Sequence, residues 1–167
     1  MELSDHLCQI LATGIEKERA AQAFYLEAAD RTQNALGEKT FRGLAKEEAN
    51  HETLLADWSA NGACPADRGP SVLDTDFITK GRDTIAKTVQ PDTGDLEALE
   101  LGQRMERQAI AFYQAAADET PDDEAKALLR QLKAEEDKHL ALLTDLYEYM
   151  KDPNLWSVRE GGAHFDA

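Results

Sequence analysis

The chain has 167 residues, 42% of them hydrophobic, and this length and composition favour one domain with a buried core. Its 33 acidic and 18 basic side chains give a net charge of −15, which repels nucleic-acid phosphates and anionic lipid surfaces. The sequence has no run of about 18 apolar residues, and its first residues lack the basic start and apolar stretch of a signal peptide. We therefore expect a cytoplasmic protein with no nucleic-acid or membrane partner.

Few glycines and prolines, with abundant Ala, Leu, Glu, Lys and Gln, predict an all-α protein. Ser4 is the expected N-cap of the first helix, and Gly62 is the expected stop of the second. Thr120 is the expected N-cap of the fourth helix, with Pro121 at its first position. The predicted helices span residues 4–32, 38–61, 95–119 and 121–151.

Short turns, around residues 34–37 and around Thr120, join these helices into two antiparallel hairpins. A long crossover, residues 62–94, connects the hairpins, and its residues 76–89 suggest an additional short helix. The predicted domain covers residues 1–152 and leaves a short C-terminal tail, residues 153–167, which we do not place.

The two halves of the sequence form a repeat with an offset of 88 residues. LATGIEKERAAQAFYLEAAD, which starts at Leu11, aligns with LELGQRMERQAIAFYQAAAD, which starts at Leu99. The same offset aligns the segment from Phe41 with the segment from Leu129 without a gap. Each half is therefore one helical hairpin, and the two hairpins close a single core.

Every predicted helix places one carboxylate on its apolar stripe, and two helices add a histidine one turn later. A Glu-x-x-His pair on a helix directs both side chains to one face. Six solvated residues would be the plain alternative, but it does not explain why these positions recur in register. The candidate metal ligands are Glu18, Glu48, His51, Glu106, Glu136 and His139.

Burying even one isolated carboxylate costs several kcal/mol, and no Lys or Arg lies on these stripes. Two divalent cations would offset the charge of four carboxylates. Carboxylate and imidazole donors suit iron or manganese, and zinc also binds them. The pattern therefore predicts a site for two metal ions.

ERAAQAFY with EEANH in the first half, and ERQAIAFY with EEDKH in the second, resemble the rubrerythrin and ferritin-like di-iron family over residues 4–150. The resemblance implies a ferritin-like four-helix bundle that holds two iron ions. It implies that Glu48 and Glu136 bridge the metals, that Glu18 and Glu106 are terminal ligands, and that His51 and His139 each hold one metal. These roles follow from the resemblance and not from spacing alone.

Two features depart from this family. Rubrerythrins usually carry a rubredoxin module with paired CxxC motifs, and this chain has none. Its electrons would then come from an external donor, such as a separate rubredoxin-like protein, or from Fe(II) itself. Ala109 also stands where ligand-swapping rubrerythrins carry a further Glu, so the resemblance does not extend to the full peroxidase cycle.

Three further pairs recur at the same offset and have two interpretations each. Tyr25 and Tyr113 either pack in the core or hydrogen-bond a metal carboxylate. Glu47 and Glu135 either face solvent or accept the second N–H of a metal-bound histidine. For Gly14 and Gly102, close helix crossing is favoured over space for an exogenous ligand.

Cys8 and Cys64 lie 56 residues apart and form no CxxC pair. We expect no disulfide framework and a reducing compartment, with Cys8 a partly buried thiol and Cys64 a loop thiol.

The residues and the resemblance together predict a di-iron carboxylate oxidoreductase that reduces peroxide or oxygen, assembled as a homodimer. A ferritin-like iron-storage protein with ferroxidase activity is the first alternative. The second alternative is a bundle in which the metals serve only stability, and a family member that no longer turns over is the third.

Overall fold

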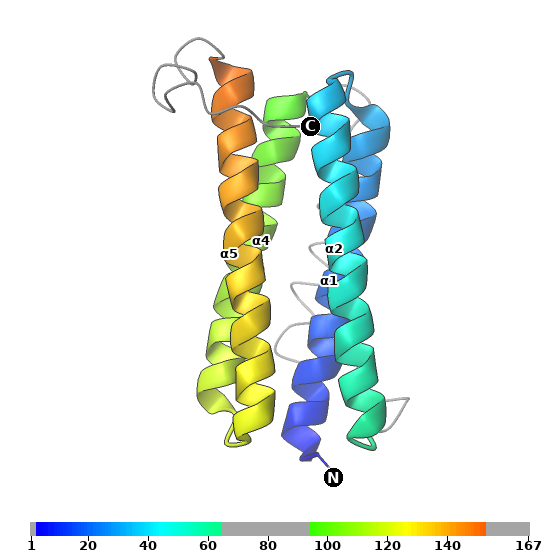
Figure 1. Ribbon diagram of the computed structural model, residues 1–167, viewed down its shortest axis with the longest axis vertical. Helices are drawn as coiled ribbons and strands as arrows, with labels where there is room; N and C mark the ends of the chain where they lie inside the picture. The colour runs from blue at the N-terminus through cyan, green and yellow to red at the C-terminus, as the bar shows by residue number, and fades with distance from the viewer. Residues whose placement is uncertain (1–2, 65–93, 153–167) are drawn as a thin grey trace.

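The computed structural model describes residues 3–64 and 94–152, and within them the chain forms four helices and no strand (Figure 1). The helices are α1 (Asp5–Arg31), α2 (Ala35–Asn61), α4 (Asp95–Glu119) and α5 (Asp123–Lys151). The all-α four-helix prediction is confirmed, and each predicted helix agrees with the observed one to within a few residues. The predicted helix at 76–89 and the tail at 153–167 lie outside the described residues.

Three of the helices begin at a side-chain cap that satisfies a free backbone N–H. Ser4 Oγ accepts from the Leu7 N–H at 3.2 Å, as predicted. Asn34 Oδ1 accepts from the Gly37 N–H at 2.9 Å, so α2 starts three residues earlier than the prediction placed it.

The predicted N-cap of the last helix is wrong. Asp122 caps α5, and its Oδ1 accepts from the Ala125 N–H at 2.8 Å. Thr120 is the C-cap of α4, and its hydroxyl donates to the Ala116 carbonyl at 2.7 Å. Both residue types suit a cap. The Thr120 side chain bonds to the backbone of α4, so the N-cap position of α5 is taken by the Asp122 carboxylate two residues later.

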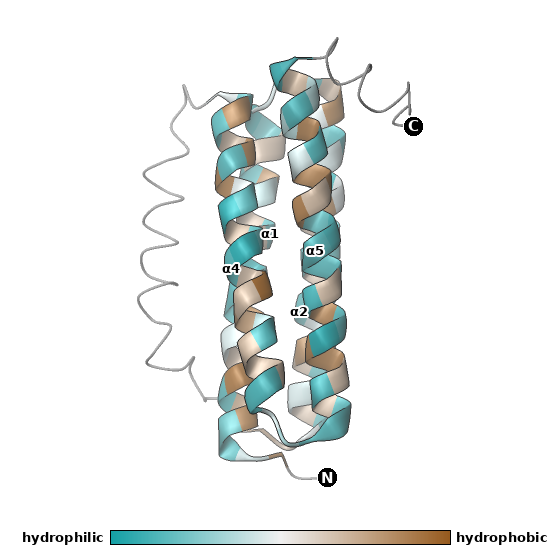
Figure 2. Ribbon diagram, turned by 90° about the vertical axis from the view of Figure 1, so that its left-hand side faces the viewer, coloured by the Kyte–Doolittle hydropathy of each residue, from teal (hydrophilic) through white to brown (hydrophobic). Residues whose placement is uncertain are grey.

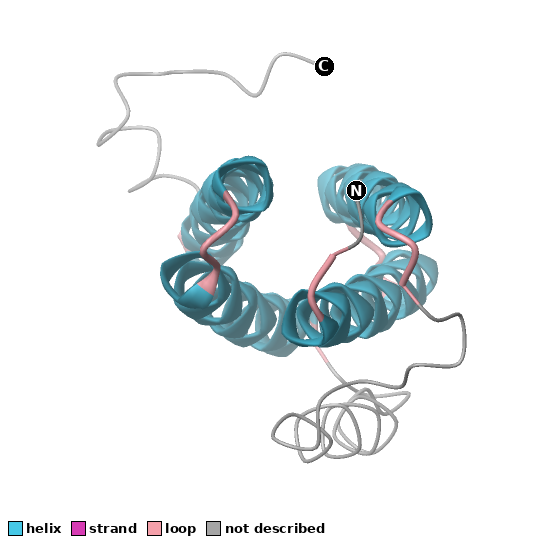
Figure 3. Cartoon of the chain, turned by 90° about the horizontal axis from the view of Figure 1, so that it is seen from below, coloured by secondary structure: helices cyan, strands magenta, loops and turns pink. Residues whose placement is uncertain are grey.

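The helices pack as two antiparallel hairpins, α1–α2 and α4–α5, that lie side by side (Figures 1 and 3). Hydrophobic residues turn inward along each helix, while polar residues dominate the outer surface (Figure 2). Between the hairpins, α1 and α4 run antiparallel, since the start of α1 packs with the end of α4.

The core consists of two apolar clusters with a polar layer between them. One cluster includes Phe24, Phe41 and Leu143, and the other includes Leu11, Leu55 and Leu129. Every one of these six side chains is fully buried. The polar layer is therefore closed off from water at both ends by hydrocarbon, in a setting where ionic groups interact strongly.

Cys8 and Cys64 form a disulfide, with their Cα atoms 5.5 Å apart, so the prediction of two separate thiols is wrong. The antiparallel hairpin is the reason, because it returns the end of α2 to the start of α1. The Leu3 N–H donates to the Gly62 carbonyl at 3.0 Å at the same place. A separation of 56 residues along the chain therefore becomes a contact in space, and the cysteines no longer argue for a reducing compartment.

Candidate metal centre

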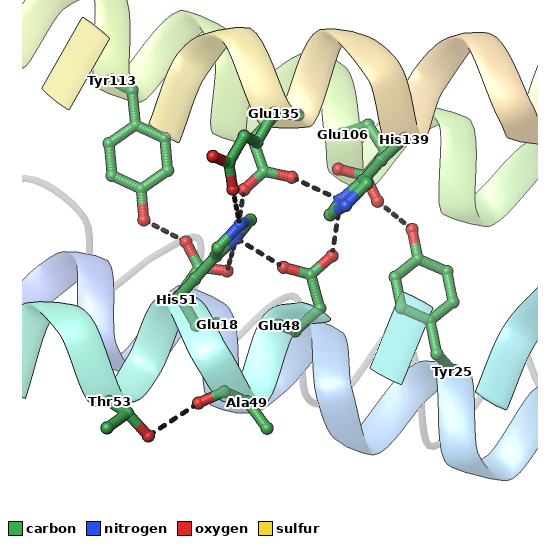
Figure 4. Close-up of polar contacts among 11 residues, drawn as sticks. Glu18, Tyr25, Glu48, Ala49, His51, Thr53, Glu106, Tyr113, Glu135 and His139 are labelled. Carbon is green, nitrogen blue, oxygen red and sulfur yellow. Dashed lines mark hydrogen bonds and ion pairs between the residues drawn. The ribbon is translucent and has the colours of Figure 1, made fainter. Parts of the chain in front are cut away.

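The six predicted ligands converge in the polar layer at the middle of the bundle (Figure 4). Each helix contributes one carboxylate, and α2 and α5 each add a histidine, as the sequence pattern requires. The five other than His139 are at most 2% exposed, and His139 is 8% exposed. The charged residues of the stripes are therefore core residues, and the solvated alternative is wrong.

The side chains form two overlapping groups, each with ligand atoms within 4.8 Å of one another. One group is Glu18, Glu48, His51 and Glu136, and the other is Glu48, Glu106, Glu136 and His139. The repeat exchanges the two groups, and Glu48 and Glu136 belong to both. A carboxylate that belongs to both groups can offer one oxygen to each of two neighbouring metal positions.

Both imidazoles face this layer through Nδ1. His51 Nδ1 lies 3.3 Å from a Glu48 oxygen and 3.0 Å from a Glu136 oxygen. His139 Nδ1 lies 3.1 Å from the other Glu48 oxygen and 3.0 Å from the other Glu136 oxygen. Each shared carboxylate thus directs one oxygen toward each histidine.

Several of these atoms are buried without a hydrogen bond. Within the described residues, Glu48 Oε1 and Oε2, His51 Nδ1 and Glu136 Oε1 make none. Buried polar atoms are almost always satisfied, and an unsatisfied one costs roughly 1–3 kcal/mol. Four such atoms in one layer, all of them good donors to a cation, fit a metal site on this chain's own geometry.

The electrostatics of the layer separate the carboxylates into two kinds. Burial raises the pKa of Glu106 to about 11, with the charges of Glu48 and Glu136 adding to the effect. Burial likewise raises the pKa of Glu18 well above its ordinary value, and the nearby His51 imidazole opposes that rise only in part. Without metal, burial therefore favours the protonated form of these two terminal carboxyls.

The shared carboxylates behave in the opposite way. Burial disfavours their charge, but the close imidazoles of His139 and His51 outweigh it and hold the pKa of Glu48 and of Glu136 below the ordinary value. In return, those carboxylates overcome burial and raise the pKa of His139 to about 9, and that of His51 further. Two imidazolium ions and two carboxylates thus neutralise the layer when protons take the place of metal.

Both tyrosines hydrogen-bond a carboxylate of the opposite hairpin, in addition to packing in the core. The Tyr25 hydroxyl donates to Glu106 Oε1, and the Tyr113 hydroxyl donates to Glu18 Oε1 (Figure 4). Burial, followed by the charge of the neighbouring carboxylate, raises the pKa of both phenols well above the ordinary value, so they stay neutral donors. Each hydroxyl fixes the rotation of one terminal carboxylate.

The two glycines that correspond in the repeat, Gly14 and Gly102, make room for these tyrosines. A Cβ on Gly14 would lie 3.0 Å from Leu55 Cδ1 and 3.4 Å from the Tyr113 hydroxyl. A Cβ on Gly102 would lie 3.1 Å from Leu143 Cδ1 and 3.3 Å from Tyr25 Cε1. The space beside each glycine is filled by side chains of other helices, and an added Cβ would crowd them.

The glutamates that precede the shared carboxylates do not behave alike. Glu135 Oε2 lies 2.8 Å from His51 Nε2, so it orients that ring from the neighbouring hairpin. Burial raises the pKa of Glu135, but the bond to His51 outweighs it and lowers that pKa overall. Glu47 is exposed, and within the described residues it makes no such bond to His139.

One buried cation, Lys17, was missed by the sequence analysis. It is 6% exposed and immediately precedes Glu18 on α1. Its Nζ lies 5.0 Å from the centroid of the Phe112 ring on α4, in a cation–π contact. The repeat could have indicated that Lys17 is buried, because the corresponding position 88 residues later holds the apolar Met105.

The chain belongs to the rubrerythrin family, whose sequence profile matches residues 9–147. Solved structures with the same fold include a mycobacterial bacterioferritin, with a TM-score of 0.68 and 18% identity over 95% of this chain and 94% of that one. A bacterioferritin-related protein from Bacteroides fragilis, described as a dodecameric thioferritin, has a TM-score of 0.66 and 24% identity over 95% and 91%. A hypothetical protein from Pyrococcus furiosus has a TM-score of 0.64 and 20% identity over 87% and 90%.

A comparison with curated protein sequences finds no significant match. The solved structures establish a ferritin-like helical bundle as the fold of this chain. None of the described helices is both long enough and apolar enough to cross a bilayer.

Proposed function

We propose that this protein holds two iron ions in the polar layer and reduces peroxide, or oxygen, at that site. Glu48 and Glu136 would be shared by the two ions in this proposal, and Glu18 and Glu106 would each hold one of them. His51 and His139 complete the two positions through Nδ1. Manganese and zinc suit the same donors, so the metal is part of the test.

The observation that carries the proposal is the sharing of Glu48 and Glu136 between two overlapping ligand groups. A single metal would engage only one of the two overlapping groups and leave the histidine and the terminal carboxylate of the other group without a metal. Four unsatisfied donor atoms in this layer support a pair of cations instead. Membership of the rubrerythrin family supports iron as the metal.

When bound, a pair of ferrous ions would supply the two electrons that, with two protons, reduce hydrogen peroxide to two waters, and both ions would be oxidised to the ferric state. The protein residues set the conditions for this exchange. The apolar clusters above and below exclude bulk water, and the cavity beside the carboxylates measures only about 20 Å³, which limits entry to small oxidants. Tyr25 and Tyr113 hold the terminal carboxylates in one orientation through the change in metal charge.

Electrons must return to the ions from outside the layer. This sequence has no CxxC motif, so a separate rubredoxin-like protein, or Fe(II) itself, is the proposed donor. The donor, the small oxidant and two irons are the partners we propose.

The test loads the protein anaerobically with Fe(II) and follows its oxidation by stopped-flow absorbance after addition of peroxide or of oxygen. We expect the protein to bind two irons per chain, and we expect peroxide to oxidise both irons rapidly. The matched control is E52Q, a glutamate of α2 outside the polar layer, which should load and react as the wild type does. Tight binding of two irons without oxidation by either reagent would contradict the redox proposal and leave a metal-stabilised bundle.

Iron storage is the second candidate, because two of the structures with this fold are a bacterioferritin and a thioferritin. Storage requires uptake far beyond two irons per chain and a hollow assembly. Fast oxidation by oxygen with continued uptake would favour it. Analytical ultracentrifugation then distinguishes the proposed homodimer from a larger shell such as the dodecamer described for the Bacteroides fragilis protein.

A further inference from the structure

A second cavity, the end cavity, lies at the end of the bundle where α1 begins and α2 ends (Figure 1). It measures about 280 Å³, and its walls are Leu3, Trp58, Asn61 and Gly62 of the first hairpin with Glu124 of the second. One water molecule fills roughly 30 Å³ of the liquid, so the end cavity has room for a small organic molecule. Trp58 follows His51 by seven residues, about 10 Å along α2, which places the end cavity outside the polar layer.

One wall of the end cavity is fixed by contacts near the Cys8–Cys64 disulfide. The Leu3 N–H donates to the Gly62 carbonyl at 3.0 Å. A Cβ on Gly62 would overlap the Leu3 side chain, so this close approach requires glycine. The disulfide ties α1 to the chain two residues after Gly62. These contacts hold the wall in place before a ligand binds, which lowers the entropic cost of binding.

The end cavity is apolar on one side and polar on the other. Trp58 and Leu3 are partly buried, and both pack on the apolar cluster at this end of the core. Asn61 and Glu124 are exposed and supply an amide and a carboxylate. A ligand that matches these walls has an apolar body and one polar group.

The charges at this end of the bundle favour a cation over an anion. Both helices that end here, α2 and α4, have no basic residue in their last turn, whereas α1 and α5 have Arg31 and Lys151 in theirs. The carboxyl end of a helix carries a partial negative charge. Acidic residues occupy the first turns of α1 and α5, which begin here, and offset the positive ends of those helices. The face of the Trp58 ring also attracts a cation.

We propose that the end cavity binds a small organic cation, an ammonium group on an apolar body. The ammonium lies between the Glu124 carboxylate and the Trp58 ring in this proposal, and the body packs against Leu3. Glu124 is exposed, so its contribution to the affinity is smaller than that of the indole. The inference is independent of the proposed metal site, because the end cavity contains none of the candidate ligands.

Three soluble probes of similar shape separate the charge of a ligand from its apolar body. Choline is the cation, 3,3-dimethyl-1-butanol is the neutral probe, and 3,3-dimethylbutyrate is the anion. The readout is the indole N–H resonance of Trp58 in the full-length protein, which W156F assigns because the chain has two tryptophans. Titrations followed by NMR give the dissociation constant of each probe.

We expect choline to shift the Trp58 resonance and to bind about tenfold more tightly than the neutral probe, with the anion weaker still. W58L should abolish choline binding, as measured by saturation transfer from protein to ligand. E124Q should weaken choline binding about threefold and leave the neutral probe unchanged. D123N is the matched control, because Asp123 is exposed in the same turn of α5 and is not among the described residues that line the end cavity.

Equal affinities for choline and the neutral probe would overturn the inference, because the end cavity would then select only for an apolar body. Equal losses in E124Q and D123N would overturn it as well, since choline would then respond to the acidic surface in general. Choline that leaves the Trp58 resonance unmoved would exclude the end cavity as its site.

Discussion

The two hairpins supply the same ligands to the polar layer but surround them differently. In the α1–α2 half, Glu135 of the neighbouring hairpin orients His51, Lys17 lies beside the cavity, and a disulfide closes the hairpin end. In the α4–α5 half, His139 lacks the corresponding contact, Met105 replaces the lysine, and no cysteine is present. The candidate ligands are thus the same in the two halves, while their surroundings differ, so the two proposed metal positions would be inequivalent.

The largest expected effect comes from the residues that the halves share. E48Q and E136Q each remove a bridging charge, so we expect each to abolish binding at both positions, with at least a hundredfold loss of metal affinity. E18Q and E106Q each change only one of the two ligand groups, so each should weaken metal binding at one position and retain it at the other. Isothermal titration with Co(II) counts the sites, and retention of one tight site in E48Q would contradict the sharing.

The disulfide should stabilise the first hairpin alone. It closes a loop with a sequence separation of 56, and by chain entropy its loss in C8S/C64S costs roughly 4 kcal/mol of unfolding free energy. Urea unfolding measures the cost, and hydrogen exchange should locate faster opening at the start of α1 and the end of α2. Adding a reductant should leave the urea unfolding of C8S/C64S unchanged. Equally fast hydrogen exchange in both hairpins would contradict the assignment.

The two histidines offer a sharper test of whether the two metal positions differ. E135Q removes the group that orients His51, so we expect the metal position beside His51 to weaken about 10- to 100-fold. E47Q is the matched control, because Glu47 is exposed and does not contact His139. Stepwise metal titration separates the two positions, and equal effects of E135Q and E47Q would show that the halves are equivalent.

The smallest expected effect is the dependence of the metal-free protein on pH. The pKa of His139 rises to about 9, so its stabilising contribution is complete below the unfolded value near 6.5 and is lost as pH rises through 9. The pKa of Glu106 rises to about 11, so the folded protein keeps a proton that the unfolded chain releases above about 4.5. Both effects lower stability as pH rises from 7 to 9, because the folded protein then binds more protons than the unfolded chain.

Metal affinity should rise over the same pH interval, because metals displace these protons. Thermal unfolding at several pH values tests the first part and metal titration tests the second. Imidazole resonances observed by NMR should show His139 losing its proton before His51. Metal-free stability that increases from pH 7 to 9 would contradict the charge assignment.

The sequence was sufficient for the fold and for the composition of the polar layer, and the reason is the repeat. Glu18 and Glu106 recur in register with the apolar stripe, so periodicity alone placed them in the core. Periodicity does not fix how one hairpin is rotated against the other, and this rotation brings Glu135 but not Glu47 to a histidine. Contacts between hairpins therefore had to come from the structure.

Other misses have local causes. Lys17 lies one position outside the stripe, and its long side chain places the ammonium over the Phe112 ring of α4. Cys8 and Cys64 meet because α2 returns along the whole of α1, a consequence of hairpin length that a search for CxxC spacing overlooks. Thr120 and Asp122 are both good caps, and the competing bond from Thr120 to α4 decides between them.

Crystals grown with Mn(II) and measured for anomalous scattering would test the central claim most directly. The account predicts two peaks per chain in the polar layer, roughly 3.5–4 Å apart. Glu48 and Glu136 should lie between the peaks, with one histidine at each. A single peak in the layer, or metal bound only at the acidic surface, would contradict the assignment of a paired metal centre.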